Sequence, residues 1–199
     1  MSRLIESICI KNGSIRNLEL HQKRINTSRE KLFGFTDKLD VESLISHKKN
    51  SLKENELIYK CRVIYSQKID CIEFIRYQMR AIKKIKLIEN NEIDYSFKFE
   101  NRIIFKELKR ENDEILIVKN NQITDTSFSN IVFFDGEKWV TPVTCLLNGT
   151  MRQSLLQSGK VKEIEIKDGD LKYFKSFKLI NAMMNLEESP ELDLSVISW

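Results

Sequence analysis

The sequence has few of the residues that build metal sites and disulfide frameworks. It holds only two histidines, too few for a histidine-rich metal site, and four cysteines that are scattered without a C-x-x-C pair. Most of the cysteines lie inside apolar stretches, which is typical of reduced thiols in a core. We therefore predict neither a disulfide framework nor a bound metal.

The sequence also lacks a long apolar run and a strong excess of one charge. No stretch approaches the ~18 apolar residues that suggest a membrane span, and the first residues resemble a strand and turn rather than a signal peptide. The 33 basic and 29 acidic side chains are interspersed and leave a net charge of only +4. We expect a cytoplasmic protein that binds neither nucleic acid nor membrane.

What the sequence does have is the composition of a folded core. With 199 residues, of which 41% are hydrophobic, the chain can form one globular domain or two small ones that share a core. The polar stretch from Glu89 to Asp94 lacks an apolar period and is the best candidate for a linker. We predict an N-terminal domain at 1–90 and a C-terminal domain at 91–199.

The first half alternates between strand and helix patterns. Asn12-Gly13 favours a hairpin turn after the first strand, Gly34 can end the first helix, and Asp40 is placed to cap the second. The predicted elements are strand 4–10, helix 18–32, helix 41–47 and a hairpin of strands 57–65 and 69–77.

The second half continues the mixed pattern, so the fold class is α/β (α+β). Asn120-Asn121 and Asp135-Gly136 are predicted turns, and Gly159 is a predicted helix end. The predicted elements are a helix from about 99 to 110, strands 114–118, 131–134 and 139–140, helix 149–158, strand 161–166, a short helix at 171–174 and strand 177–181.

Lys98 is the first candidate for chemistry, since it lies between Phe97 and Phe99 at a predicted junction of strand and helix. Desolvation disfavours an ammonium ion, and a lysine with a lowered pKa is a competent nucleophile toward an aldehyde. The alternative is an ordinary solvated lysine, so Lys98 needs supporting residues.

Three further segments could supply that support. Asp125, in the polar stretch Thr124–Asn130, could face a protonated pyridine nitrogen, or it could form a turn in an ordinary hairpin. The start of the helix after Gly149 could bind a phosphate, or Asn148 could simply cap it. Arg24 shares a helix face with His21 and could grip a phosphate, or that face could be solvated.

These segments, in this order, resemble the class IV aminotransferase family, whose members use pyridoxal 5′-phosphate (PLP) and include branched-chain and D-amino-acid aminotransferases and aminodeoxychorismate lyase. Leu4–Ile8 with the Asn12-Gly13 turn is similar to the family's Phe-Glu-Thr strand and hairpin, and His21–Arg24 to its His-x-x-Arg helix. Ile123–Ile131 is similar to its strand with an acidic residue, and Leu147–Arg152 to its phosphate loop. The similarity covers nearly the whole chain.

The resemblance implies a fold like that of D-amino-acid aminotransferase, with two domains, the cofactor in the cleft between them, and a homodimer. It implies that Lys98 forms the Schiff base with PLP, that Arg24 contacts the phosphate, and that Asp125 faces the pyridine nitrogen. The other cofactor residues that it implies are Leu147, Gly149, Thr150, Met151 and Asn181. Candidates for the small amino substrate are Arg62 and Arg102, although Arg62 could equally pair with a neighbouring glutamate.

Three departures from the family bear on the function. Asp125 stands where the family usually has Glu, so the strand must lie nearer the ring or a water must bridge. The chain begins almost at the Glu6 strand, so we expect a shortened N-terminal domain. Ile103 stands near the position where the aminotransferases have Tyr, and Lys98-x-x-Asn101-Arg102 is more similar to the lyase branch.

The resemblance therefore implies a PLP-dependent 4-amino-4-deoxychorismate lyase that yields 4-aminobenzoate and pyruvate, a step toward folate, with Lys98 as general base. A transaminase for branched-chain or D-amino acids is the alternative within the family. A catalytically inactive binding homologue that keeps only the fold is a second alternative.

Overall fold

A computed structural model describes residues 2–49 and 58–199, which form two compact units. Unit 1 is Met1–Met79 with Phe97–Asn101, and unit 2 is Arg80–Ser96 with Arg102–Trp199. Phe97–Asn101 belongs to unit 1 because it pairs with the first strand: the Ile5 N–H donates to the Lys98 carbonyl at 2.9 Å. The predicted domain boundary at residue 90 stays a prediction. The compact units of the structure divide the chain differently, because residues 97–101 pair with the first strand.

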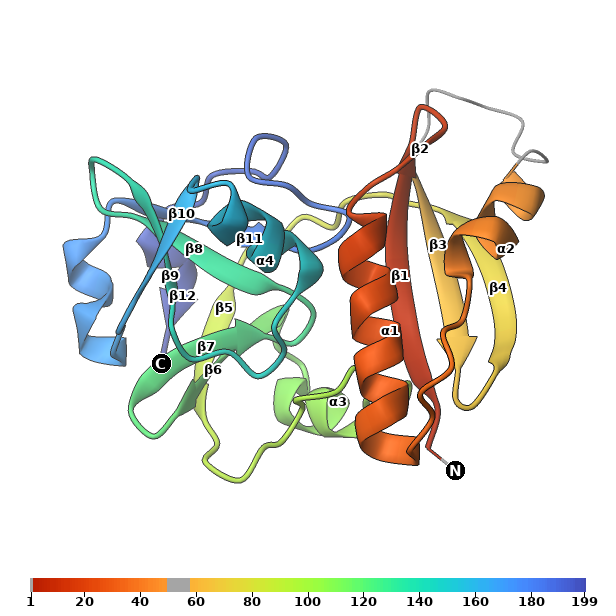
Figure 1. Ribbon diagram of the computed structural model, residues 1–199. Helices are drawn as coiled ribbons and strands as arrows, with labels where there is room; N and C mark the ends of the chain where they lie inside the picture. Colours follow the sequence, from red (N-terminus) through yellow and green to blue (C-terminus); the bar gives the residue numbers. More distant parts are fainter. Residues whose placement is uncertain (1, 50–57) are drawn as a thin grey trace. The chain divides into compact units, whose positions relative to one another are not determined.

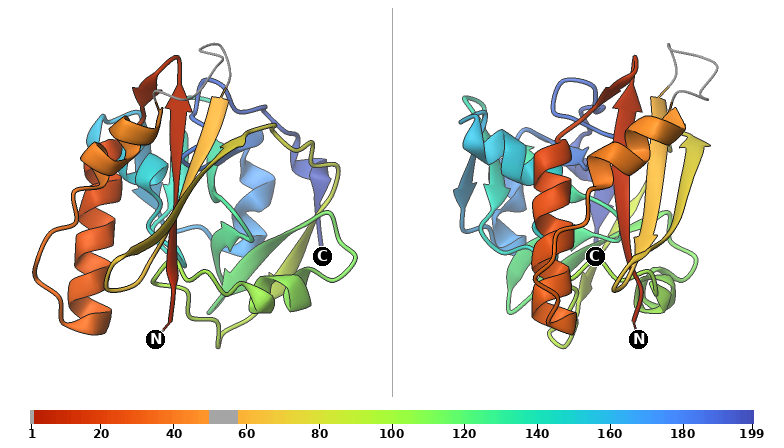
Figure 2. Two further views of the ribbon diagram at one scale, coloured as in Figure 1. Left: turned by 90° about the vertical axis from the view of Figure 1, so that its right-hand side faces the viewer. Right: turned by 45° about the vertical axis from the view of Figure 1, so that its right-hand side comes forward.

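Unit 1 is a four-stranded antiparallel sheet with two helices packed on one face (Figures 1 and 2). Its elements are β1 (Leu4–Lys11), β2 (Ser14–Ile15), α1 (Leu18–Phe33), α2 (Val41–Lys49), β3 (Ile58–Tyr65) and β4 (Ile69–Arg76), and the strand order is β2-β1-β3-β4. Ile25 of α1 and Ile45 of α2 join Ile8 and Val63 in one apolar core. Burial of these side chains holds both helices on the sheet.

Local signals predicted most of unit 1 correctly. Asn12 and Gly13 both have positive φ, 51° and 73°, as a tight hairpin turn requires. Gly34 ends α1 at φ 75°, and the Asp40 carboxylate accepts a hydrogen bond from the Ser43 N–H at 2.9 Å at the start of α2. The predicted hairpin is β3 and β4, although Leu57, its first predicted residue, lies outside the described residues.

Unit 2 contains two four-stranded sheets, ordered β12-β5-β6-β7 and β10-β9-β8-β11. Its strands are β5 (Ile85–Glu89), β6 (Glu114–Lys119), β7 (Gln122–Thr126), β8 (Asn130–Phe134), β9 (Trp139–Pro142), β10 (Val161–Ile164), β11 (Ser176–Ile180) and β12 (Ile197–Ser198). Its helices are α3 (Ile103–Lys109) and α4 (Thr150–Gln157), with 3₁₀ helices η1 (Asp168–Tyr173) and η2 (Leu194–Val196). β7 and β8 are consecutive in the chain but belong to different sheets. The polar Thr124–Asn130 stretch therefore connects one sheet to the other.

Some predicted elements of unit 2 were wrong. The helix expected from residue 99 begins only at Ile103, because Phe99 forms a β-bridge with Leu4 instead. β5 was not predicted, since it is stabilised by parallel pairing with β6 and β12, which are far from it in sequence. The strand expected at 161–166 ends at Ile164, and the short helix expected at 171–174 is η1.

In the part of the chain that the structure describes, there is no helix with the length and apolarity needed to cross a membrane.

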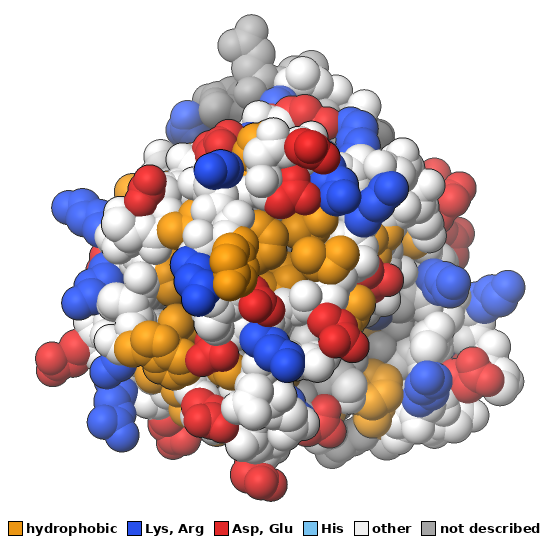
Figure 3. Space-filling view, turned by 90° about the vertical axis from the view of Figure 1, so that its left-hand side faces the viewer, with side chains coloured by type: hydrophobic (Ala, Val, Ile, Leu, Met, Phe, Trp, Pro, Cys, Tyr) orange, Lys and Arg blue, Asp and Glu red, His pale blue; other side chains and the backbone are white. Residues whose placement is uncertain are grey.

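The surface carries both polar and apolar side chains. Figure 3 shows a face on which apolar side chains gather, with charged ones around them. In unit 2 the more exposed large apolar side chains are those of Ile103, Val143, Ile164, Tyr173 and Trp199.

Candidate active site

In unit 1, Arg24 is held by a buried carboxylate. Glu6 of β1 accepts hydrogen bonds from Nε of Arg24 at 2.7 Å and from Nη2 at 2.5 Å. Nδ1 of His21, one turn earlier on α1, lies 2.6 Å from the second Glu6 oxygen. The side chains of Glu6 and His21 are fully buried, whereas that of Arg24 is 14% exposed. The expected alternative of a solvated helix face is therefore wrong for this face of α1.

The charges of this cluster follow from its contacts. Burial alone would raise the pKa of Glu6, but the charge of Arg24 and the hydrogen bonds from Arg24 and His21 outweigh it and lower that pKa to about 2. Burial lowers the pKa of His21, and its bond to Glu6 offsets only part of that effect. Glu6 is thus an anion and His21 neutral near pH 7, which makes Nδ1–H of His21 the donor to Glu6.

Lys98 lies in the same unit as this cluster. Its carbonyl accepts from the Ile5 N–H, one residue before Glu6, and the Glu100 N–H donates to the Arg3 carbonyl at 2.9 Å. The Lys98 side chain is half-buried, and its charge contributes to lowering the pKa of His21. The structure therefore brings two predicted site residues, Lys98 and Arg24, to the neighbourhood of one strand, β1.

In unit 2, Asp125 lies near the end of β7 and is buried. Its Oδ1 accepts from Nδ2 of Asn130 at 2.7 Å, and its Oδ2 accepts from the Leu147 N–H at 2.9 Å. Burial raises the pKa of Asp125 to about 6, although the two hydrogen bonds and the charge of Arg152 act against the rise. The turn considered as the alternative does exist, but Thr126 makes it: its hydroxyl accepts from the Ser129 N–H at 3.0 Å.

The predicted phosphate loop leads into α4. Gly149 is the N-cap residue, and no side chain caps the helix. Asn148, the expected alternative cap, instead accepts a hydrogen bond from Nη1 of Arg152 at 3.1 Å. Thr150 and Met151, the first residues of α4, are buried. The backbone dipoles of a helix give its N-terminus a partial positive charge, so this end of α4 suits an anion.

The remaining predicted residues have defined partners. Arg62 pairs with Glu73 at 3.0 Å and with Glu100 at 2.8 Å, as the structural alternative expected. Arg102 donates to the Ser127 carbonyl, in the loop after β7. Asn181 closes a tight turn after β11, where its Oδ1 accepts from the Met183 N–H at 2.8 Å.

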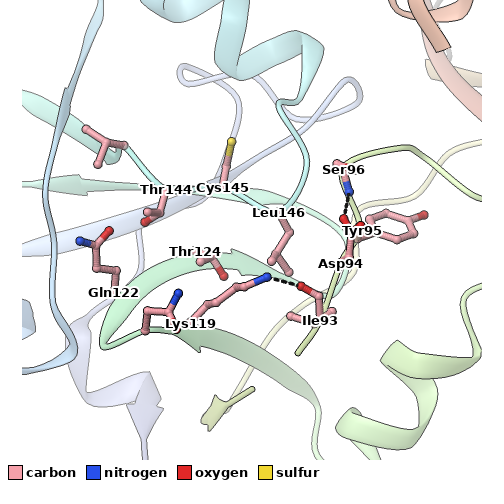
Figure 4. Close-up of a pocket in the computed structure, with 12 residues that line it drawn as sticks. Ile93, Asp94, Tyr95, Ser96, Lys119, Gln122, Thr124, Thr144, Cys145 and Leu146 are labelled. Carbon is pink, nitrogen blue, oxygen red and sulfur yellow. Dashed lines mark hydrogen bonds between the residues drawn. The ribbon is translucent and has the colours of Figure 1, made fainter. Parts of the chain in front are cut away.

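A separate cavity of about 480 Å³ lies within unit 2 (Figure 4). Thr124, Thr144, Cys145 and Leu146 line it, together with Lys119, which donates to the Ile93 carbonyl at 2.6 Å. Burial raises the pKa of the Cys145 thiol to about 11, so this thiol is not a nucleophile near neutral pH. Among the described residues, β7 contributes Gln122 and Thr124 to the lining of this cavity, and Asp125 is not part of that lining.

Two kinds of group described above suit a cofactor that has a cationic ring and a phosphate. Asp125 is a buried carboxylate whose charge is disfavoured by burial, so a cationic ring N–H beside it would stabilise it. Each of its oxygens has lone pairs for a further hydrogen bond. The guanidinium of Arg24 in unit 1, and the start of α4 in unit 2, suit a phosphate group.

Three residues that fix the candidate site residues in place were assigned no role from the sequence. They are Glu6, Asn130 and Arg152. Arg152 of α4 bonds to the Pro142 carbonyl at 2.9 Å and to Glu163, and so anchors the loop before the helix. A charged residue inside the apolar strand Leu4–Ile10 was the signal that could have identified Glu6, because a buried charge needs partners.

Comparison with known proteins identifies the family. Residues 100–187 match the family Amino-transferase class IV. A protein of Haemophilus influenzae (strain ATCC 51907 / DSM 11121 / KW20 / Rd), itself uncharacterised, is 35% identical over 189 residues, which are 94% of this chain and 100% of that protein. A crystal structure from Haemophilus somnus 129pt, provisionally assigned as a 4-amino-4-deoxychorismate lyase, has 31% identity and a TM-score of 0.87, over 94% of this chain and 98% of that one.

More distant structures share the fold. A provisionally assigned amino-acid aminotransferase from Mesorhizobium loti has 21% identity and a TM-score of 0.77, over 96% of this chain and 98% of that one. An aminotransferase from Brucella abortus, solved with PLP, has 17% identity and a TM-score of 0.72, over 96% and 80%. The expected fold is confirmed. The chain belongs to the class IV aminotransferase family.

Proposed function

We propose that this chain is a PLP-dependent lyase that converts 4-amino-4-deoxychorismate into 4-aminobenzoate and pyruvate, and so serves folate synthesis. The observation that carries the proposal is the similarity over nearly the full length of both chains to the Haemophilus somnus protein, which has this provisional assignment. Asn101-Arg102 after Lys98, and Ile103 in place of a tyrosine, also favour the lyase branch over the transaminases.

The residues proposed to hold PLP are those that the family resemblance implies. Lys98 would bind its aldehyde carbon, and Arg24 with the N–H groups of Thr150 and Met151 would bind its phosphate. Asp125 would accept from its ring N–H. Leu147 would pack on the ring, Gly149 would let the backbone approach the phosphate, and Asn181 would close the site. Bound PLP supplies a conjugated ring that takes up the electrons released at the substrate's amine-bearing carbon.

Three residues of the chain are proposed to move a proton or to stabilise charge during the reaction. Nζ of Lys98 is the proposed base, which would remove the proton from the amine-bearing carbon of the substrate. The Asp125 carboxylate would keep the ring nitrogen protonated, because two opposite charges stabilise each other in a buried site. Glu6 fixes the Arg24 guanidinium by accepting two hydrogen bonds from it, so Arg24 would hold the phosphate in one place.

The proposed substrate contacts involve two arginines. Arg62 and Arg102 are the proposed partners of substrate carboxylates, and the two differ in how they are engaged. Arg62 already faces the carboxylates of Glu73 and Glu100, which would compete with a substrate carboxylate. Arg102 donates to a neutral carbonyl and is therefore the stronger candidate.

Turnover and colour test the proposal together. The purified protein with PLP should absorb in the near-visible range and should form 4-aminobenzoate from 4-amino-4-deoxychorismate without a second amino acid. If the protein forms no 4-aminobenzoate but forms a keto acid from alanine or leucine in the presence of 2-oxoglutarate, it is a transaminase. A protein that stays colourless with PLP would be an inactive homologue.

The role of Lys98 has its own test. Lys98→Ala should lose the near-visible band and lower turnover by about 100-fold or more, the usual effect of a missing general base. Lys106→Ala, at an exposed lysine of α3, is the matched control and should keep both. Full activity in Lys98→Ala would refute the assignment.

We also propose that the protein is a homodimer, as in its family. Apolar side chains that gather on one face (Figure 3) are the kind of surface that a partner covers. Sedimentation should give a mass twice the 23.5 kDa of one chain, and a single-chain mass at all concentrations would contradict it.

A further inference from the structure

Asn130 connects three parts of unit 2 through one side chain. Its Nδ2 donates to Oδ1 of Asp125 at 2.7 Å and to the Leu147 carbonyl at 2.9 Å. Asn130 is buried at the start of β8, while Asp125 belongs to β7 and Leu147 to the loop before α4. Both hydrogens of this amide are therefore used, one on each neighbour.

The other end of the same amide meets Gly149. A Cβ atom added to Gly149 would lie 2.1 Å from Oδ1 of Asn130 and 3.3 Å from its Cγ. The first separation is far below van der Waals contact and the second is tighter than an ordinary contact. The Asn130 side chain cannot move away without breaking its hydrogen bonds to Asp125 and Leu147. The backbone of Gly149 has φ −64°, an ordinary value for any residue, so space rather than conformation excludes a side chain here.

Asp125 closes the arrangement from the other side. Its Oδ2 accepts from the Leu147 N–H at 2.9 Å, while Asn130 binds the Leu147 carbonyl. The polar groups of Leu147 are thus both held, one by Asp125 and one by Asn130. The ring of contacts fixes the direction of the carboxylate and the path of the loop that leads to α4.

We propose that Asn130 is a positioning residue that orients the Asp125 carboxylate toward the cofactor ring and sets the Leu147–Gly149 loop against the phosphate, and that it makes glycine necessary at position 149. The part that concerns the cofactor rests on the proposed function. The part that concerns Asp125, Leu147 and Gly149 does not, because all the contacts lie within the protein.

The first test removes the amide. In the protein without PLP, Asn130→Ala should raise the pKa of Asp125 above about 6, because the carboxylate loses a donor that favours its charged form. The measurement is ¹³C NMR of the carboxyl groups across pH, with Asp125→Asn to assign the signal. With PLP added, the variant should bind it about tenfold more weakly, the lower end of the loss seen when a residue that supports a metal ligand is removed.

Controls separate positioning from general destabilisation. Ser189→Ala removes a buried hydrogen bond of the same unit, from its hydroxyl to the Leu179 carbonyl at 2.8 Å, and should leave the Asp125 titration and the PLP affinity unchanged. If Asn130→Ala does not fold, Asn130→Ser takes its place, with the same expected directions. An Asp125 titration that is the same with and without the Asn130 amide would overturn the proposal.

The second test is a double-mutant cycle on unfolding. Gly149→Ala should destabilise the protein strongly when Asn130 is present and much less when residue 130 is alanine, since the clashing oxygen is then gone. The two effects should depart from additivity by at least about fivefold in the unfolding equilibrium constant. Additive effects would show that Asn130 does not restrict position 149.

The outcomes distinguish this inference from the proposed function. A wild-type protein that fails to bind PLP would end the proposed function, while the Asp125 titration and the cycle would still decide the role of Asn130. A wild-type protein that binds PLP, together with an Asn130→Ala variant that binds it equally well, would refute the positioning role alone.

Discussion

Glu6→Gln should destabilise unit 1 in a way that depends on pH. The pKa of Glu6 is lowered from its ordinary value of 4.5 to about 2 in the folded protein. Each pKa unit corresponds to ~1.4 kcal/mol, so the charged carboxylate contributes about 3 kcal/mol to the free energy of unfolding near pH 7. Gln keeps the shape but presents N–H groups to Arg24 or His21 in place of one carboxylate oxygen.

The sign follows from the depressed pKa. The contribution of Glu6 is fully present above pH 4.5, the pKa of the unfolded chain, and falls as the pH drops toward about 2. The pKa of Glu6 is lowered by about 2.5 units, and at pH 3 only about one of these units still contributes to stability. The difference in unfolding free energy between wild type and Glu6→Gln should therefore shrink by about 2 kcal/mol between pH 5 and pH 3. The pH dependence that Asp125 adds to stability is the same in wild type and in Glu6→Gln, so it cancels in the difference between them.

Urea denaturation across this pH range measures the difference directly. Asp37→Asn is the matched control, since Asp37 also pairs with an arginine of α1, Arg29, at 3.0 Å but is 64% exposed. Its effect should be small, below about 1 kcal/mol. A Glu6→Gln difference that is constant from pH 3 to pH 7 would show that the charge of Glu6 does not stabilise the fold.

Two further variants test other parts of the structure. Asp125→Glu, which introduces the residue more usual in the family, should destabilise the protein by about 1–3 kcal/mol in urea denaturation, because the added methylene pushes the carboxylate into Asn130 and the Leu147 N–H; equal or greater stability would contradict the tight fit. Gly34→Ala should cost about 1 kcal/mol by the same measurement, since Gly34 has φ 75°; an unchanged midpoint would mean that the end of α1 relaxes without strain.

Local sequence signals were sufficient where a short segment decides its own conformation. Asn12-Gly13 has the residues that accept positive φ, and the apolar period of α1 runs up to Gly34, so both were predicted and both are present. The same holds for the hairpin turn at Asp135-Gly136, where the Asp135 carboxylate accepts from the Glu137 and Lys138 N–H groups at 2.9 Å.

The sequence failed where distant segments compete for the same residues. Phe99 fits the helical period of α3, but pairing with Leu4 keeps it extended. That pairing also decides that Lys98 joins the unit that contains Glu6 and Arg24. The flanking Phe97 and Phe99 made Lys98 a candidate but could not exclude an ordinary solvated lysine, so its assignment came from the family resemblance and from the order of the motifs.

By itself the sequence determined the local elements, the family, and the residue types at the proposed site, because these depend on neighbours along the chain and on motif order. Only the tertiary structure decided that Glu6 holds Arg24, that burial raises the pKa of Asp125, and that Asn130 fills the space beside Gly149. Desolvation and steric exclusion depend on which groups surround an atom, and those groups come from segments that lie far apart in the sequence.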